Sequence, residues 1–496
     1  MNILTAPSHL WAKIAQQLQP PQMVENMAIG FLGINRAKGH REFLLREVDI
    51  PAPSDYRARS PASVELGSEK VAEVLDKSRH FPCLLFAHNH LFDAFISSTD
   101  EAGIRDLLRC YRSFRRDGCL IQMVWGTNGI LARVADVQTG RWIFLDAVKV
   151  VGPEGLRLIP TLNARHPLQS FDKDRQLRTL TFLGERGEEV LNLVANLAIG
   201  VIGVGGNGAA ATYLLKFLGF KRWVLVDPDH IEPHNANRFF GFRVGDEGRP
   251  KVGVVMRELL SFDPSLHCLG LVFPFPSLEA IEALKPCDLI LCCPDNNWVR
   301  LQAAQFCARY HKVLVEVGAG IELGGDTKHP RHIGCQVRLQ VPGGPCLVCN
   351  GLSLEQEDPF VEAIKRAQGR AVGYVTDADL PNPGSVVSLN AMAATLLVRV
   401  LLGYLAGLGT VPTYLFYDDL RLKLVDASSP RCPDCPLCGE HPNALFGWGD
   451  ELPVWMRILR PQEVSDDGTL PEAVGGAHLA EGQHGDRACP PQPSVL

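Results

Sequence analysis

Two groups of residues in this 496-residue sequence have the types and the spacing of metal ligands. The first group is His88 and His90 at the end of an apolar run, followed ten residues later by Asp100. Side chains two positions apart on a strand point to the same face, so both imidazoles would lie together. Two histidines and a carboxylate leave the fourth position of a tetrahedral zinc site open for water. His88, His90 and Asp100 are therefore predicted to hold a catalytic zinc ion.

A hydrolytic zinc site also needs a general base and a donor to the oxyanion of the tetrahedral intermediate. Glu25, just before the apolar run that starts at residue 27, is the candidate base. Glu42 and Glu47, on the next predicted strand, are alternatives. Ser97, three residues before Asp100, is the candidate oxyanion donor. The competing interpretation is that two histidines at a strand end are ordinary surface residues near a turn.

This pattern resembles that of the JAB/MPN metalloproteases, whose signature is a Glu on an early strand, then His-x-His-Pro, then Ser-x-x-Asp. The resemblance covers roughly residues 13–150 and implies a zinc isopeptidase that cleaves after the C-terminal tail of ubiquitin-like proteins. It implies that Glu25 activates the zinc-bound water and that Ser97 stabilises the oxyanion. Leu91 stands where the family has proline, and the spacer before Ser97 is one residue shorter.

Four cysteines in two Cys-x-x-Cys pairs form the second group of ligands: Cys346, Cys349, Cys435 and Cys438. Four thiolates make a closed tetrahedral zinc site that holds two distant segments together and leaves no open position for chemistry. The pairs therefore predict a structural zinc, with Cys432 as an alternative ligand in the second pair. Two redox-active pairs are the competing interpretation, and they would require a thioredoxin-like setting.

A glycine-rich turn indicates a nucleotide site in the second half of the chain. Gly203, Gly205, Gly206 and Gly208 lie between an apolar strand at 198–204 and a helix at 208–219. Such a turn lets the backbone approach phosphate and aims the helix N-terminus at it. Asp227, at the end of the next strand, has the spacing of a ribose-binding carboxylate. By itself the turn fits a dinucleotide oxidoreductase as well as an activating enzyme.

Charged and amide side chains near the ends of the later predicted strands distinguish an oxidoreductase from an activating enzyme. Adenylylation needs a carboxylate for magnesium and cations for the triphosphate, whereas hydride transfer needs no such set. Taken singly, Lys251, Asp295 and Arg300 could each be an ordinary solvated residue at the start of a helix. Together, the charged and amide side chains favour ATP chemistry: Asp229, Asn235, Arg238, Lys251 and Asp295.

The same residues resemble the pattern of the ThiF and ubiquitin-activating-enzyme superfamily, from about residue 174 to residue 439. The resemblance implies that the four glycines line the nucleotide, that Asp227 binds the ribose with Asp229 beside it, and that Asp295 holds magnesium. It further implies that Asn235 and Arg238 contact phosphates and that Lys251 contacts the triphosphate during transfer. It also implies a homodimer in which an arginine of one subunit completes the ATP site of the other, with Arg175 as first candidate and Arg178 as second.

Hydrophobic patterning supplies the elements that position these sites, and the predicted fold class is α/β. Short strands at 27–33, 42–49, 82–88, 119–126 and 142–147, with a helix at 68–78, indicate an α+β JAB/MPN-like domain over residues 1–151. Residues 152–173 are predicted to be a linker. Alternating strands and helices predict a Rossmann-like, doubly wound ThiF-type domain over residues 174–440. Residues 441–496 are predicted to be a disordered tail.

Composition and hydrophobic patterning indicate which kinds of partner and which cellular location to expect. The net charge of −6 does not favour nucleic acid. The apolar stretch 385–411 contains Asn390 and Arg399, so it is predicted to be a buried helix and not a membrane span. The first twenty residues lack the features of a secretory signal, which predicts a cytoplasmic protein whose 15 cysteines are reduced.

These observations predict a bifunctional enzyme of a ubiquitin-like modifier pathway that adenylylates the modifier's C-terminal glycine and cleaves modifier (iso)peptide bonds. One alternative is activation of a sulfur-carrier protein for thiocarboxylate-based biosynthesis, and another is a non-catalytic scaffold that binds the modifier. Residues 350–431 contain no cysteine, and neither Cys335 nor Cys489 has an evident activating neighbour. The acyl-adenylate is therefore predicted to pass to an external thiol, on a conjugating enzyme or a sulfur donor.

Overall fold

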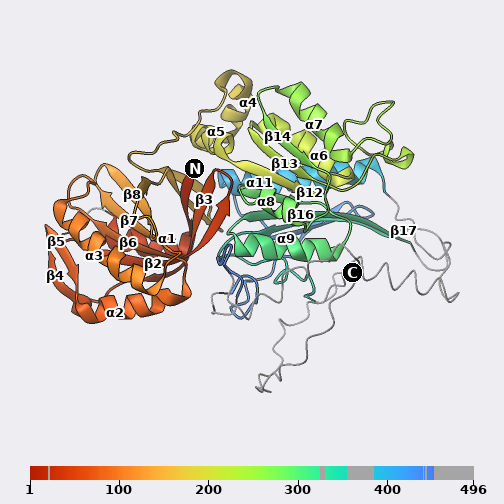
Figure 1. Cartoon of the computed structure of the whole chain (residues 1–496). Helices are drawn as coiled ribbons and strands as arrows, with labels where there is room; N and C mark the ends of the chain where they lie inside the picture. Colours follow the sequence, from red (N-terminus) through yellow and green to blue (C-terminus); the bar gives the residue numbers. More distant parts are fainter. Residues whose placement is uncertain (20–22, 324–329, 355–384, 440, 442–443, 452–496) are drawn as a thin grey trace, which may run out of the picture. The chain divides into compact units, whose positions relative to one another are not determined.

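Two large sheets organise the chain in the computed structural model, which describes residues 1–19, 23–323, 330–354, 385–439, 441 and 444–451 (Figure 1). The first sheet belongs to residues 1–160, called here the N-terminal half. The second belongs to residues 173–439, called here the C-terminal half. Residues 1–451 nevertheless form a single compact unit, because buried contacts join the two halves.

The sheet of the N-terminal half has nine strands in the order β11-β10-β1-β3-β2-β6-β7-β8-β9. Helix α1 (Ser8–Leu18) packs against it through Leu10, Trp11, Ile14 and Leu18, which recur at helical spacing and are all buried. Helices α2 (Ser68–Lys77) and α3 (Ser98–Phe114) and a separate hairpin of β4 (Tyr56–Ser60) and β5 (Ser63–Leu66) complete this half. The strands are β1 (Asn2–Pro7), β2 (Met27–Ala37), β3 (His40–Asp49), β6 (Cys83–Asn89), β7 (Cys119–Gly126), β8 (Gly129–Asp136), β9 (Trp142–Phe144), β10 (Ala147–Gly152) and β11 (Gly155–Pro160).

The predicted strands at 27–33, 42–49, 82–88 and 119–126 and the helix at 68–78 are all found, whereas the one predicted at 142–147 is divided between β9 and β10. In this half, five strands were not predicted: β1, β4, β5, β8 and β11. β11 corrects the linker assignment, because residues 155–160 of the predicted linker pair with β10 in an antiparallel ladder. Of the three prolines in residues 152–173, Pro160 is the last residue of β11, whereas Pro153 and Pro167 lie outside the strand and do not interrupt its ladder.

The C-terminal half has an eight-stranded sheet in the order β14-β13-β12-β15-β16-β17-β18-β19. Strands β12 to β16 are parallel and are connected by helices, whereas β17, β18 and β19 add on in antiparallel fashion. This is the predicted α/β, Rossmann-like arrangement. The strands are β12 (Ala198–Ile202), β13 (Arg222–Val226), β14 (His267–Leu271), β15 (Leu289–Cys292), β16 (Val313–Leu323), β17 (Pro330–Gln340), β18 (Tyr414–Asp418) and β19 (Lys423–Asp426).

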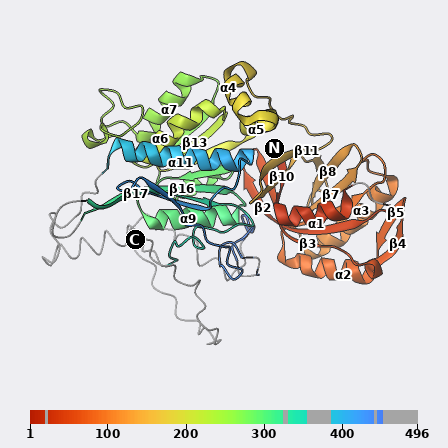
Figure 2. The same cartoon turned by 180° about the vertical axis from the view of Figure 1, so that it is seen from behind.

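Helices cover both faces of this sheet: α9 lies on the near side in Figure 1 and α11 on the near side in the view from behind (Figure 2). By length and composition, α11 (Val387–Ala406) could cross a membrane, but 61% of its most apolar 18-residue stretch is buried in the protein. It packs against α6, β16 and β17, as expected of the predicted buried helix. The other helices are α4 (Lys173–Leu183), α5 (Gly187–Asn196), α6 (Gly206–Leu215), α7 (Lys251–Phe262), α8 (Leu278–Leu284) and α9 (Asn297–Arg309).

A buried charge network joins the two halves. Glu42 of β3 is fully buried and forms ion pairs with Lys149 of β10 and with Lys312, at 2.6 Å, from the turn before β16. Lys149 also pairs with Asp288, at 2.8 Å, and Asp288 accepts a hydrogen bond from the backbone of Ala198 at the start of β12. Both acids keep pKa values below their usual ones, because the lysines outweigh the effect of burial. The halves predicted as separate domains thus share one set of buried charges.

Residues 444–451, called here the connecting segment, lie between the two halves. Gly449 forms a parallel bridge with Ile34 of β2, and Asp450 accepts a hydrogen bond from the backbone of Arg36. On its other side, Asp450 pairs with Lys285 at 2.8 Å and accepts a hydrogen bond from the Tyr310 hydroxyl. The predicted disordered tail at 441–496 therefore contains packed residues at its start, and residues 452–496 lie outside the described part of the chain.

Candidate functional sites

The glycine turn and Asp227 form one edge of the C-terminal sheet. Gly203 has φ +81°, and a Cβ on Gly208 would lie 2.0 Å from the carbonyl oxygen of Gly203, so both positions require glycine. The Asp227 carboxylate accepts hydrogen bonds from the backbone amides of Val204, at 2.7 Å, and Asp229, at 2.9 Å. Burial raises the pKa of Asp227. Asp227 thus anchors the turn after β12 to the end of β13.

The loop after β15 lies directly against this turn. A Cβ on Gly203 would be 3.1 Å from the backbone of Cys293 and of Pro294, one residue before the exposed Asp295. On the other side, Asn390 at the start of α11 donates a hydrogen bond to Asn207 at 2.6 Å. The glycine turn, Asp227 and the Asp295 loop are therefore brought together as predicted.

Lys251 begins α7 and reaches back toward this edge. Its ammonium pairs with the Asp229 carboxylate at 2.7 Å, and its backbone amide donates to the Asp229 carbonyl. Asp229 is mostly exposed, so a bound polyanion can compete with it for Lys251. Lys251, at the start of α7, and Asp229, just after β13, are thus adjacent to each other.

Asn235 and Arg238 have local structural contacts in this conformation. Asn235 is buried, and its side-chain oxygen accepts a hydrogen bond from the backbone of Glu232. Arg238 donates to the carbonyl of His234 and to the side chain of Asn237. Among the described contacts, neither side chain reaches the glycine turn, so their predicted phosphate contacts would require a rearrangement of residues 232–238.

The four cysteines of the two pairs form a compact cluster. The sulfur atoms of Cys346, Cys349, Cys435 and Cys438 all lie within 4.8 Å of one another, and all four residues are buried. The shortest contacts join Cys346 to Cys435, at 3.5 Å, and Cys349 to Cys438, at 3.6 Å. Cys432, the alternative ligand, contributes only its backbone amide, which donates to the Cys349 sulfur. Four thiols at this spacing fit a tetrahedral zinc ion.

The histidine cluster lies where β6 ends and α3 begins. His88 and His90 are both buried, and their Nε2 atoms are 3.1 Å apart. Asp100 lies 3.2 Å from His88 and 3.5 Å from His90. Burial opposes ionisation of Asp100, but hydrogen bonds with the two histidines outweigh it and hold the pKa of Asp100 well below its usual value. Two imidazoles and an ionised carboxylate aimed at one point fit a zinc ion with an open position.

Glu25 is the carboxylate that faces this cluster. It is 8% exposed, and burial raises its pKa even though His90 and His88 act in the opposite direction. The two alternative bases form ion pairs elsewhere: Glu42 pairs with Lys149 and Lys312, and Glu47 pairs with Lys77 at 2.7 Å. Of the three predicted candidates for the base, Glu25 is the one whose charge interacts with His88, His90 and Asp100.

Ser97 has a structural role as the N-cap of α3. Its hydroxyl accepts a hydrogen bond from the backbone of Asp100 at 3.1 Å, and the Asp100 carboxylate accepts one from the backbone of Ser97 at 2.8 Å. This reciprocal capping box fixes the start of α3 and the orientation of Asp100. The Ser-x-x-Asp spacing is therefore explained in part by helix capping, while the hydroxyl remains able to donate its own hydrogen.

Comparison with known proteins identifies the family of the C-terminal half. Residues 173–437 match the ThiF family model. The chain belongs to the ThiF family. The C-terminal half, called the ThiF half from here on, therefore has the fold and the nucleotide edge of a ThiF-type adenylyltransferase. The match begins at residue 173, so the N-terminal half lies outside it.

Individual relatives resemble the same part of the chain. The sulfur carrier protein adenylyltransferase of Thermus thermophilus is 27% identical, over 55% of this chain and 93% of that protein. Ubiquitin-like modifier-activating enzyme 5 of Gallus gallus is 26% identical, over 49% of this chain and 59% of that enzyme. A crystal structure of E. coli MccB with ATP is 18% identical, with a TM-score of 0.43, and the alignment covers 55% of this chain and 76% of that one.

Arg175 does not contact the glycine turn of its own chain in any described interaction. It pairs with Asp263 at 3.1 Å and with Asp172 at 3.4 Å, at the far end of the ThiF half. The resemblance assigned Arg175 to the ATP site of a second subunit, and a single chain does not test that assignment.

A buried ion cluster next to the Asp295 loop was missed by the sequence analysis. Glu316 of β16 is fully buried and pairs with Arg338 of β17 at 2.7 Å and with Arg300 of α9 at 2.9 Å. Arg300 also donates to the carbonyl of Pro294, which braces the loop before Asp295. Glu316 and Arg338 are direct partners across two strands, and no spacing in the sequence indicates that register.

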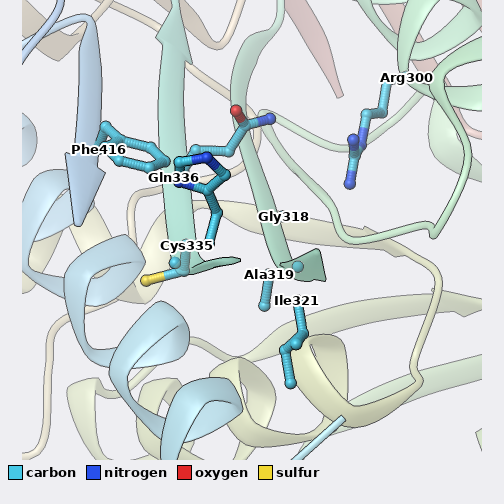
Figure 3. Close-up of a pocket in the computed structure, with 10 residues that line it drawn as sticks. Arg300, Gly318, Ala319, Ile321, Cys335, Gln336 and Phe416 are labelled. Atoms are coloured by element: carbon cyan, nitrogen blue, oxygen red, sulfur yellow. The ribbon is translucent and has the colours of Figure 1, made fainter. Parts of the chain in front are cut away.

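A cavity of about 350 Å³ opens beside this cluster. Figure 3 shows Arg300 and Phe416 on opposite sides of it, with Gly318, Ala319 and Gln336 between them. Gly318 has no room for a side chain, because a Cβ there would lie 2.7 Å from the Arg300 guanidinium. The ThiF half thus has a glycine-lined cavity that shares Arg300 with the Asp295 loop.

Proposed function

We propose that the ThiF half adenylylates the C-terminal glycine of a ubiquitin-like modifier or a sulfur-carrier protein. The observation that carries this proposal is the juxtaposition of the glycine turn, the anchored Asp227 and the Asp295 loop at one sheet edge. The names of two relatives, a sulfur carrier protein adenylyltransferase and a ubiquitin-like modifier-activating enzyme, support this substrate class. The cavity beside Arg300 has space for the small residues of an extended tail.

In this reaction the terminal carboxylate attacks the α-phosphorus of ATP, an acyl-adenylate forms and pyrophosphate leaves. The N-terminus of α6 presents backbone amides to the phosphates. Lys251 leaves its ion pair with Asp229, binds the triphosphate and neutralises charge on the pyrophosphate leaving group. Asp295 would hold the magnesium ion that neutralises phosphate charge, and Asp227 accepts a hydrogen bond from the ribose. Arg238 contacts phosphate after its loop rearranges, and Arg175 completes the ATP site of the second subunit in a homodimer.

The test is ATP–pyrophosphate exchange in the presence of a protein or peptide with a free C-terminal glycine. Asp295→Ala and Lys251→Ala should each abolish exchange, whereas Asp106→Ala, which removes a 71% exposed carboxylate from α3, should leave it unchanged. Exchange that does not require the glycine carboxylate, or none with any such substrate, would contradict the proposal and favour a non-catalytic scaffold.

We further propose that the N-terminal half is a JAB-like zinc isopeptidase acting on the same modifier. The support is the convergence of His88, His90 and Asp100 with Glu25 facing them. Zinc bound there would activate a water molecule for attack on the carbonyl carbon. Glu25 accepts the proton from that water and passes it to the leaving amine, while the Ser97 hydroxyl donates to the oxyanion.

Two measurements test this second activity. The purified protein should contain two zinc ions, one for each cluster, and should cleave a fusion placed after the modifier's terminal glycine. Glu25→Gln should retain both zinc ions and lose cleavage, because only the base is removed. A protein that holds zinc at the cysteines alone would contradict the assignment without affecting the proposal for the ThiF half.

We propose that the acyl-adenylate passes to a thiol outside this chain, on a conjugating enzyme or a sulfur donor. Burial raises the pKa of Cys335 to about 12, so this thiol stays protonated at neutral pH. Cys489 lies outside the described residues. A thiol-sensitive band between enzyme and modifier on a non-reducing gel, lost in Cys489→Ala or Cys335→Ala, would contradict external transfer. We also propose a cytoplasmic location, where the cysteines that do not bind zinc would stay reduced.

A further inference from the structure

A second cavity of the ThiF half, of about 530 Å³, lies away from the nucleotide edge. Its walls come from α4, from the short helix Lys216–Leu218 that continues α6, and from the end of α7. The glycine turn is at the start of α6 and this cavity is at its end, so about 15 Å of helix separates them. Its volume is within the range of about 300 to 1,000 Å³ that is usual for small-molecule sites.

The cavity contains a hydrogen-bond acceptor without a partner. Gln176 is 6% exposed, and its Nε2 donates to the carbonyl of Phe217 at 2.7 Å. This bond fixes the orientation of the amide, because a rotated amide would place two oxygens against each other. Its Oε1 is buried without a hydrogen-bond partner. A buried acceptor of this kind is unfavourable unless a ligand or water donates to it.

The cavity also contains a cation that no described carboxylate neutralises. Lys216 is 7% exposed, and its ammonium lies over the ring of Tyr213, 3.7 Å from the centroid. No carboxylate of the described residues lies within 4.0 Å of it. Burial lowers the pKa of Lys216, and Glu258, which acts in the opposite direction, is itself paired with Arg243 at 2.9 Å. By contrast, Asp263 in the same wall is satisfied by Arg175, Lys221 and Ser265. The positive charge of Lys216 therefore remains available to an anion.

Aromatic rings form the rest of the wall. Phe217 is 48% exposed and Phe262 is 37% exposed, and the two rings meet edge to face at 5.0 Å. Phe171 and Phe220 also line the cavity. The cavity thus combines exposed aromatic rings, a cation and a hydrogen-bond acceptor. A complementary ligand has an apolar ring system, an anionic group and a hydrogen-bond donor.

We propose that this cavity binds a small aromatic anion: a planar apolar ring system with one anionic group for Lys216 and one N–H or O–H donor for Gln176 Oε1. The ring packs against Phe217 and Phe262. The cavity is distinct from the nucleotide edge of its own chain, and none of the contacts proposed for this ligand involves Arg175, the lining residue that is assigned to the ATP site of a second subunit.

The probe for the test is 8-anilinonaphthalene-1-sulfonate, which carries aromatic rings, one sulfonate and one anilino N–H. Its neutral twin, N-phenyl-1-naphthylamine, has the same rings and N–H but no anionic group. Fluorescence titration of the full chain should show saturable, one-to-one binding of the sulfonate, tighter than that of the twin.

Variants separate the two polar contacts. Lys216→Met should weaken binding of the sulfonate about tenfold and leave the neutral twin unchanged, because only the charge contact is lost. Gln176→Leu should weaken both probes severalfold, because both have the N–H. Lys173→Met, which removes a 67% exposed lysine from α4, is the matched control and should change neither probe.

Two results would overturn the inference: no saturable binding by the wild-type protein, or equal loss of both probes in Lys216→Met. Thermal melting of each variant distinguishes a lost contact from a lost fold. If Lys216→Met fails to fold, Lys216→Gln, which keeps a polar group over the rings, gives the same comparison of the two probes.

Discussion

The four-cysteine cluster and the histidine cluster both bring their donor atoms within 4.8 Å, but they are built in different ways. The cysteine pairs are 86 residues apart in sequence, from Cys349 to Cys435, and all four donors come from buried thiols. The histidine cluster comes from one strand and the following helix, with three donors and a separate carboxylate, Glu25, facing them. A zinc ion held by the four thiols would have no open position and would stabilise the fold, whereas one held by the two histidines and Asp100 would have a position open for chemistry.

The largest expected effect of a single change is on the closed cluster. Cys435→Ser should remove one zinc ion and lower the free energy of unfolding on the order of 5 kcal/mol, since structural zinc contributes roughly 10–16 kcal/mol to the folding of small zinc domains. Zinc analysis and denaturant unfolding measure both quantities. Cys110→Ser, at an exposed cysteine of α3, is the control. Unchanged stability in Cys435→Ser would show that the cluster does not hold the fold together.

The open cluster should respond in activity and hardly in stability. His88→Ala should remove the other zinc ion and lower cleavage of a modifier fusion by about a thousandfold or more, roughly 4 kcal/mol in activation free energy. Pyrophosphate exchange by the ThiF half should stay unchanged. His80→Ala, at an exposed histidine before β6, is the matched control. Loss of exchange in His88→Ala would mean that the two sites are not chemically independent.

The junction between the halves tests whether the two clusters belong to one cooperative unit. Glu42→Gln should lower the free energy of unfolding by about 3 kcal/mol, because it leaves Lys149 and Lys312 buried with one partner fewer. A single unfolding transition in the wild type, and two in the variant, would show that these charges couple the halves.

The same variant should alter acid unfolding. The pKa of Glu42 is lower in the folded state than in the unfolded chain, so its contribution is complete above about pH 4.5 and is lost as the pH falls toward the folded value. The stability of Glu42→Gln should therefore fall less steeply than that of the wild type below about pH 4.5. Parallel profiles of melting temperature against pH would contradict the role of this network.

The smallest expected effect separates capping from catalysis at Ser97. Ser97→Ala should cost about 1 kcal/mol through loss of the N-cap, whereas Ser97→Gly should cost only a few tenths of a kcal/mol. If the hydroxyl also stabilises the oxyanion, both variants should lose cleavage to a similar degree. If cleavage instead follows helix stability, Ser97 is a cap and nothing more, and the open cluster has no oxyanion donor at this position.

Local motifs predicted much of both halves. The glycine turn was recognisable because Gly203 and Gly208 occupy positions that exclude a side chain, and the cysteine pairs because tetrahedral thiolate sites have a fixed local spacing. The histidine cluster was recognisable because strand periodicity places His88 and His90 on one face. Strand β1 was missed because both of its partners, β3 and β10, lie far away in the sequence. Strands β8 and β11 pair with the strand just before them through a short turn, and the sequence analysis did not identify these two turns.

The sequence by itself therefore determined the residues with local signatures: the glycine turn, the two cysteine pairs and the His-x-His strand end. Only the tertiary structure decided which glutamate faces the histidines, because Glu42 and Glu25 differ in their neighbours and not in their chemistry. It also decided that Glu316 and Arg338 meet, that residues 444–451 pack between the halves, and that Gln176 and Lys216 share a cavity. Spacing along the chain fixes local geometry, whereas burial and long-range pairing arise only when distant segments fold against one another.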